Sequence, residues 1–246
     1  MSIILYDIPS TSRGYSVSPN TWRIRYCLNI KGIPYTTEWV EFPDIVPLYK
    51  KLGVAPTAKK LDGSGPHPTL PMIYDPSTNT YIPDSLAIAE YLESQYPEAP
   101  QVFPHNTGGL IQAFSDMFLL RVVEARNLLT WNIFAKLNPA SIGYYREVRE
   151  KALGVKMEEL VPDDQLVAEL DRLKAILGKI DELYAKNGGK GPYIMGDVPS
   201  WADILVASVV VVFRVSYGDG SEIWKKIVSW NEGRWGILVD DMKRYE

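Results

Sequence analysis

The sequence predicts a two-part protein: an α/β domain followed by an all-helical domain. In the first hundred residues, short segments of apolar and β-branched residues alternate with helical patterns, and turn residues separate them. After about residue 103, every patterned segment carries helical periodicity. We therefore expect domains at residues 1–97 and 104–246, joined by a short link. The 246 residues are enough to bury a substantial core.

The first domain is expected to follow the order β-α-β-α-β-β-α. The expected strands are 2–8, 35–42, 70–74 and 80–82, and the expected helices are 20–31, 43–52 and 85–96. Residues 54–69 are rich in proline, glycine and serine, which favours a loop. A right-handed βαβ unit followed by a hairpin and a covering helix is close to the thioredoxin plan.

The second domain is expected to contain helices over residues 108–137, 164–186, 200–215 and 223–245, the last of which reads as one or two helices. The segment 200–215 is apolar on nearly all sides, which indicates a buried central helix. Ser200 and Asp203 precede it at the spacing of a capping box, with Asp in place of the usual Glu or Gln.

Composition excludes several classes of function. The formal net charge is −4 and no basic block occurs, so we expect no nucleic-acid partner. The single cysteine, Cys27, permits no internal disulfide, and the separated His67 and His105 do not predict a metal site. The longest apolar run, 204–213, is too short to cross a membrane, and no signal peptide is evident. We expect a soluble cytoplasmic protein without a metal.

Leu70–Pro71 opens an expected strand, where a proline cannot donate a ladder hydrogen bond. A cis peptide in a tight corner would leave the neighbouring backbone able to pair with an extended peptide ligand. Considered alone, an ordinary edge-strand proline is the commoner explanation, because only about 5–6% of X–Pro bonds are cis.

Two helix starts carry polar residues that suit a ligand. Asp84–Ser85 begins the helix 85–96, where it would cap free N–H groups or hold a carboxylate and an ammonium group. Ser18 precedes Pro19 at the start of the helix 20–31, where its hydroxyl would cap the helix or donate to an anion such as a thiolate. Ser16 is the alternative donor at this position.

In order and spacing these stretches resemble a cytosolic glutathione S-transferase of the serine type, over essentially the whole chain. The matching stretches are Ser18–Pro19 with WRIRYCLNIKGIPY, Leu70–Pro71, DSLAI from Asp84 and GDVPSWAD from Gly196. Within the family, the N-terminal half looks most like the bacterial β-etherases and the fungal etherase-related FuA class.

The resemblance implies a set of roles in binding glutathione, the co-substrate. Ser18 would activate the thiol, and the backbone of Leu70 before Pro71 would pair with the cysteinyl part. Asp84 and Ser85 would hold the γ-glutamyl end.

One part of the expected site departs from the family pattern. The family often has Lys, Gln or Arg ahead of the cis-proline motif, and GPHPT stands there in this chain. His67, or else Lys59 or Lys60, would then bind the glycyl carboxylate.

The resemblance also implies an electrophile site between the domains. The candidates are Tyr15, Val17, Phe114, Met117, Phe118, Arg121 and Val122. Alternatively, several of these side chains belong to the core or to a dimer face, because aromatic residues at helical spacing usually pack inside.

The resemblance implies a homodimeric transferase, suited to detoxification, whose glutathione thiolate attacks hydrophobic aromatic electrophiles by conjugation or ether cleavage. The alternative is a non-catalytic ligandin that binds aromatic or polyphenolic molecules. A family member whose site has decayed ranks last, because the matching motifs are all present.

Overall fold

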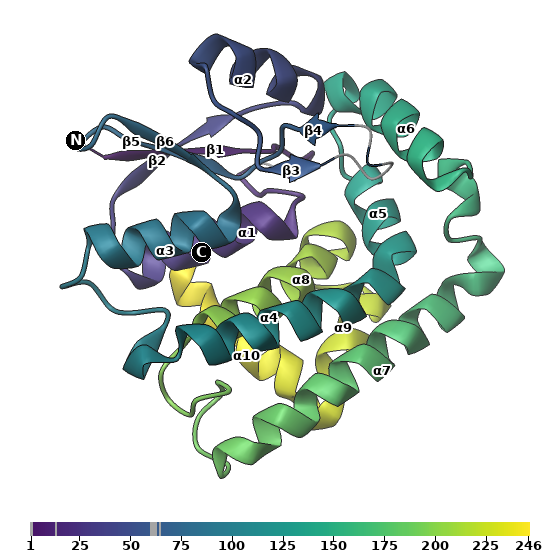
Figure 1. Ribbon diagram of the computed structural model, residues 1–246. Helices are drawn as coiled ribbons and strands as arrows, with labels where there is room; N and C mark the ends of the chain where they lie inside the picture. The colour runs from purple at the N-terminus through teal and green to yellow at the C-terminus, as the bar shows by residue number, and fades with distance from the viewer. Residues whose placement is uncertain (1, 13, 60–62, 64) are drawn as a thin grey trace. The chain divides into compact units, whose positions relative to one another are not determined.

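The computed structural model describes residues 2–12, 14–59, 63 and 65–246. The chain forms two compact units (Figure 1). The first contains Met1–Pro100 and Phe134–Met157, and the second contains Gln101–Ile133 and Glu158–Glu246. A segment near the middle of the sequence therefore packs with the N-terminal unit.

The first unit is built on a four-stranded sheet in the order β2-β1-β5-β6. The strands are β1 (Ile3–Asp7), β2 (Tyr35–Trp39), β5 (Met72–Asp75) and β6 (Thr80–Pro83). Strands β1 and β2 are parallel, whereas β5 is antiparallel to both of its neighbours. The parallel pair is joined through α1 (Pro19–Ile30), as expected for a βαβ unit.

Helices cover both faces of this sheet. Figure 1 shows α1 and α3 (Ser85–Gln95) side by side on one face, and α2 (Ile45–Leu52) on the other. Leu5, Ile73 and Ile82 pair in register and are buried, so they line a single face. The α/β domain with a thioredoxin-like plan is therefore confirmed.

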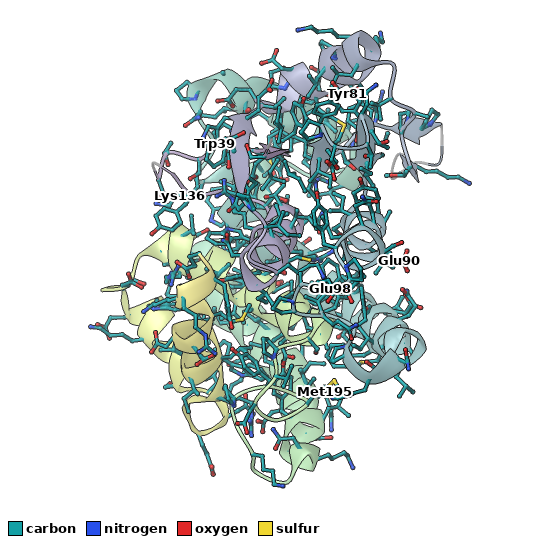
Figure 2. All side chains as sticks on the ribbon, turned by 90° about the vertical axis from the view of Figure 1, so that its left-hand side faces the viewer. Trp39, Tyr81, Glu90, Glu98, Lys136 and Met195 are labelled. Carbon is teal, nitrogen blue, oxygen red and sulfur yellow. The ribbon has the colours of Figure 1, made fainter. Side chains whose placement is uncertain are left out.

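The opposite face of the sheet carries a tyrosine cluster. Tyr74 and Tyr81 are register partners with ring centroids 4.6 Å apart, and the Tyr6 ring lies 6.4 Å from that of Tyr81. Tyr81 is labelled in Figure 2. Such aromatic pairs across strands stabilise the sheet beyond the area that they bury.

An ion pair fastens α1 to the sheet. The Arg25 Nε donates to the Asp7 carboxylate at 2.5 Å, and that carboxylate is fully buried. The Arg25 guanidinium also lies 4.8 Å from the centre of the Trp39 ring. These contacts hold the middle of α1 against the ends of β1 and β2.

The segment expected to be a loop contains a short ribbon. Strands β3 (Ala58–Lys59) and β4 (Pro66–His67) pair antiparallel, with Ala58 opposite His67. Two-residue strands carry too few residues for an alternating pattern, so the sequence could not show them.

Helix α6 (Pro139–Leu153) belongs to the first unit and was not expected from the sequence. It packs on the single turn η1 (Phe42–Asp44), where the Phe42 and Tyr145 rings meet edge to face at 4.8 Å. The Phe42 N–H donates to the Ser141 hydroxyl at 2.9 Å. Pro139 at the first helical position and Gly154 at the C-terminus are the start and stop signals that mark this helix.

The second unit is all-helical, as expected. Its helices are α4 (Gly108–Val122), α5 (Arg126–Phe134), α7 (Leu166–Tyr184), α8 (Trp201–Tyr217), α9 (Glu222–Ser229) and α10 (Arg234–Met242). Short 3₁₀ turns lie at η2 (Pro104–Asn106), η3 (Val123–Ala125), η4 (Met157–Glu159), η5 (Asp163–Gln165), η6 (Ala185–Asn187), η7 (Asn231–Gly233) and η8 (Lys243–Tyr245).

The expectation of a single helix over 108–137 is wrong. The turn η3 separates α4 from α5, and the Arg126 N–H bonds to the Val123 carbonyl, three residues back. Ala125, the last residue of this turn, is fully buried.

Helix α8 is the buried centre of the second unit, since every residue from 201 to 215 is buried. The expected capping box is confirmed at its start. The Asp203 Oδ2 accepts from the Ser200 N–H at 2.9 Å and the Ser200 hydroxyl at 2.7 Å. Its Oδ1 accepts from the Ile194 N–H and the Tyr184 hydroxyl, so the carboxylate joins three segments.

We predict that Ser200→Ala lowers the free energy of unfolding by about 0.5–2 kcal/mol, because the start of the buried helix loses a capping group. Chemical denaturation would measure the change. Ser229→Ala is the control, since that exposed hydroxyl donates to the Lys226 carbonyl one turn back, and it should change stability by less than about 0.5 kcal/mol. Equal stability of Ser200→Ala and the wild type would contradict the prediction.

Candidate functional site

Three polar segments of the first unit meet at one edge of the sheet. Met72, which begins β5, pairs with Tyr6 near the end of β1 and with Pro83 at the end of β6. Pro71 directly precedes Met72, and Asp84 directly follows Pro83. The chain also leaves β1 at this edge and then enters α1 after a loop. The register therefore brings Leu70–Pro71, Asp84–Ser85 and the start of α1 to the same side of the unit.

Ser18 is the N-cap residue of α1, with φ −97° and ψ 123°, and Pro19 occupies the first helical position. Its side chain makes no capping hydrogen bond. Its carbonyl accepts from the Trp22 N–H at 3.1 Å and the Thr21 hydroxyl at 3.0 Å. The Ser18 hydroxyl is thus not engaged in the cap and lies at the positive end of a 12-residue helix.

Ser16 builds the turn that holds Ser18. It is fully buried, and its Oγ accepts from the Ser18 N–H at 3.1 Å and bonds the Thr21 hydroxyl at 2.6 Å. Its carbonyl accepts from the Trp22 indole N–H at 3.0 Å. These contacts occupy Ser16, so Ser18 is the better placed of the two serines to meet a ligand.

The Leu70–Pro71 peptide is cis, as the resemblance implies. Both residues are buried. The preceding carbonyl, of Thr69, accepts from the Tyr49 hydroxyl at 2.6 Å. Because the ladder between β1 and β5 begins at Met72, the backbone of Leu70 lies just outside it.

Asp84 caps α3, which is the first of the two roles expected for it, capping the helix and binding a ligand. Its Oδ1 accepts from the N–H groups of Leu86 and Ala87 at 3.0 and 3.1 Å. Asp84 has φ +76°, which is uncommon for a residue with a side chain and costs conformational energy. Its side chain is exposed, whereas that of Ser85 is buried at the first position of the helix.

Arg23 is the member of this region that sequence reasoning missed. It lies on α1, is 7% exposed, and its Nη1 is 3.5 Å from the Ser85 hydroxyl. Burial lowers the pKa of the guanidinium to about 10, and the Asp84 carboxylate partly opposes this shift. In the sequence Arg23 looks like an ordinary charge on the outer face of a helix. Its apolar neighbours Trp22 and Ile24 were the available signal that this part of α1 is buried.

Two of the three candidates for the glycyl carboxylate lie on the β3–β4 ribbon. His67 is half-buried in β4, three residues before Leu70, and Lys59 is exposed in β3. Lys60 lies outside the described residues.

The two electrophile candidates in the first unit differ in exposure. The Tyr15 ring is 41% exposed and stacks on the Trp22 ring at 6.0 Å, with 30° between the planes. The Trp22 ring in turn lies 5.4 Å from that of Tyr26 inside the core. Val17 is buried, so its side chain belongs to the core.

The candidates on α4 belong to the second unit. Phe118 is fully buried and stacks with the half-buried Phe114 at 6.1 Å. Met117, Arg121 and Val122 are half-buried, and the Arg121 Nε lies 3.3 Å from the Met117 sulfur. The core alternative therefore applies to Phe118, while the other four side chains keep some exposed surface.

Within the described residues, no group of three or more histidine, cysteine, aspartate or glutamate side chains is arranged to hold a metal ion. In the same part of the chain, no helix is long and apolar enough to cross a membrane.

Two family models match this chain. The glutathione S-transferase N-terminal domain matches residues 17–95, and the glutathione S-transferase C-terminal domain matches residues 109–245. The chain belongs to the glutathione S-transferase family.

Solved structures of this family resemble the chain over its whole length. One is the glutathione S-transferase CsGST63524 of Ceriporiopsis subvermispora in complex with glutathione, with a TM-score of 0.93 and 37% identity. Another is the glutathione transferase GSTFuA3 of Phanerochaete chrysosporium, with a TM-score of 0.91 and 40% identity. Each comparison covers 100% of this chain and 98% of the other. The resemblance to FuA-class proteins is therefore confirmed.

A relative found by sequence comparison belongs to the same family by its name. The glutathione S-transferase-like protein ustS of Aspergillus flavus is 30% identical over 96% of this chain and 86% of its own length.

In this glutathione S-transferase, Cys27 is not placed to act as a nucleophile. It is fully buried on α1, and burial raises the pKa of its thiol to about 12. A buried protonated thiol is neither exposed nor in its reactive form.

We predict that iodoacetamide leaves the folded protein unlabelled at neutral pH and modifies Cys27 once the chain is unfolded. Mass spectrometry before and after denaturation would measure the labelling. Stoichiometric modification of the folded protein would show that Cys27 is accessible and would contradict the burial described above.

Proposed function

We propose that this protein is a glutathione transferase in which the Ser18 hydroxyl stabilises the thiolate of bound glutathione. The observation that carries the proposal is the Ser18 hydroxyl itself. It is not used in the helix cap, and it lies at the sheet edge shared by Leu70–Pro71 and Asp84–Ser85. Glutathione is bound in the structure of CsGST63524, a relative 37% identical to this chain, which supports glutathione as the co-substrate of this protein.

The proposed chemistry follows from charge. The thiolate, not the thiol, is the nucleophile, and a free thiol has a pKa of about 8.5. A hydroxyl that donates to the sulfur and the positive end of α1 both favour the charged form. Together they would lower the pKa of the bound thiol toward neutral pH.

The polar groups at the sheet edge suit the rest of glutathione. The backbone of Leu70 would pair with the cysteinyl residue in the manner of an added strand. The Asp84 carboxylate would meet the γ-glutamyl ammonium, and Ser85 would donate to the α-carboxylate. His67 or Lys59 would hold the glycyl carboxylate.

We propose hydrophobic aromatic electrophiles as the second substrate. The exposed Tyr15 ring, supported from behind by Trp22, offers a flat surface for stacking within the first unit. In conjugation the sulfur forms a bond to carbon and a leaving group departs. In ether cleavage the sulfur forms a bond to the carbon that carries the aryloxy group, the carbon–oxygen bond breaks, and the released phenolate takes up a proton.

The exposed Tyr15 ring also supports the alternative of a ligandin, because stacking alone binds an aromatic molecule without reaction. Tight binding of polyphenols without any glutathione-dependent turnover would favour the ligandin over the enzyme.

We also propose a homodimer. Leu110, Leu120 and Val123 in the second unit are 75%, 74% and 53% exposed. Large exposed apolar side chains gathered on one segment favour association. Sedimentation at several concentrations would show a dimer if the proposal is correct and a monomer if it is wrong.

We predict that Ser18→Ala lowers kcat/KM about 10- to 100-fold toward an aromatic halide, because a hydrogen bond to a charged group contributes roughly 1.5–3 kcal/mol. The affinity for glutathione should change little, and the pH–rate profile should move to higher pH. Ser229→Ala, which removes a hydroxyl in the other unit, is the control. Full activity in Ser18→Ala would transfer the role to Ser16 or to backbone N–H groups.

We predict that Asp84→Asn weakens glutathione binding about tenfold or more and leaves thermal stability nearly unchanged. Asn caps a helix as well as Asp but carries no charge for the γ-glutamyl ammonium. Calorimetric titration would measure the affinity. Glu90→Gln is the control, since this carboxylate is also on α3 but extends outward from the helix (Figure 2). An equal loss in both variants would mean that net charge, not the site, governs binding.

A further inference from the structure

Arg23 is a buried cation directly behind the start of α3. It lies on α1 about 7–8 Å along the helix axis from Ser18. Its guanidinium meets the Ser85 hydroxyl at 3.5 Å, and its Nε has no hydrogen-bond partner among the described residues. A charged group is rarely this deeply buried without a partner, because the loss of hydration is costly.

The neighbouring residues do not neutralise this charge. Within the part of the chain that the structure describes, no ion pair joins Arg23 to a carboxylate. Asp84 acts on it electrostatically, but the Asp84 Oδ1 accepts both capping hydrogen bonds of α3. The positive charge of Arg23 therefore adds to the positive end of the helix and favours an anion there.

The half-buried Arg25 shows that an arginine on the inner side of α1 does not by itself imply a ligand. Arg25 lies two residues after Arg23, about half a helical turn further along α1. Its guanidinium contacts the Asp7 carboxylate, the Thr37 hydroxyl and the Trp39 ring. Arg25 is accounted for by the structure of the unit, and Arg23 is not.

The contact with Arg23 determines what Ser85 can do. A guanidinium has donors only, so in this pair the Ser85 oxygen accepts. The single hydroxyl proton of Ser85 is then left to point elsewhere, as a donor. An acceptor bound at the start of α3 would meet this proton, the helix end and the charge behind them.

We propose that Arg23 is a positioning residue that makes the start of α3 selective for ligands with a carboxylate at the γ-glutamyl end. It acts through Ser85 and through its charge, without reaching the reacting sulfur. The inference rests on the proposed function, because it concerns the same site. The inference adds Arg23 to the residues of that site. It also explains why the protein should bind a thiol peptide that lacks this carboxylate more weakly than glutathione.

The test compares two ligands by calorimetric titration: glutathione, and γ-aminobutyryl-cysteinyl-glycine, which lacks only the α-carboxylate. The wild type should prefer glutathione about 10- to 100-fold. Arg23→Met should lose most of this preference by weakening glutathione binding alone. Arg23→Lys, which keeps the charge, should retain part of it. Lys151→Met is the control, since it removes one exposed cation from α6 and should keep the full preference.

A second arm tests whether Arg23 acts through Ser85. Ser85→Ala and Arg23→Met combined should lose less glutathione affinity than the sum of the single losses, because the two side chains serve one interaction. In steady-state assays Arg23→Met should raise the KM for glutathione and leave kcat nearly unchanged.

The outcomes separate this inference from the proposed function. A wild-type protein that binds neither ligand would overturn both. A wild type that prefers glutathione, together with an Arg23→Met variant of unchanged preference, would overturn the inference alone. If Arg23→Met does not fold, Arg23→Gln, of similar length and without charge, replaces it. A folded Arg23→Gln variant with wild-type preference would likewise overturn the role.

Discussion

The candidate site depends on the position of one residue in the sheet register. Met72 is fully buried and pairs with Tyr6 on one side and Pro83 on the other. This double pairing brings the cis peptide before Met72, the strained Asp84 after Pro83 and the exit from β1 to a common edge. A shift by one residue would turn every side chain of β5 to the opposite face, which the burial of Ile73 strongly disfavours. Core packing thus fixes the geometry of the polar edge.

Two helices then supply the chemistry at that edge. Ser16 and Thr21 shape the turn before α1 through their own hydrogen bonds, and the Ser18 side chain makes no capping hydrogen bond. At the start of α3 the hydrogen bonds are arranged differently. Asp84 caps the helix, and the Ser85 hydroxyl lies against the buried Arg23 guanidinium. In the proposed function the start of α1 meets the sulfur anion and the start of α3 meets the carboxylate, and both would use the positive end of a helix dipole.

Much of this arrangement could be predicted from the sequence because its signals are local. Ser18 before Pro19, Asp84 at a helix start and Leu70–Pro71 are recognisable from neighbouring residues. The helix start at Ser18–Pro19, the Asp84 cap and the cis peptide are confirmed, although the Ser18 side chain makes no capping hydrogen bond. The burial of Arg23 was missed because it depends on α3, which lies 62 residues further along the chain. Helix α6 went unpredicted although Pro139 and Gly154 mark its ends, and its packing on η1 is long-range.

The central claim is that Ser18 holds the bound sulfur as a thiolate. The most direct measurement is the ultraviolet absorbance of the thiolate in the glutathione complex, titrated with pH in the wild type and in Ser18→Ala. Our account predicts that the wild-type complex ionises well below the ordinary thiol pKa of about 8.5 and that Ser18→Ala shifts ionisation back toward it. Identical titration of the two complexes would contradict the assignment of Ser18.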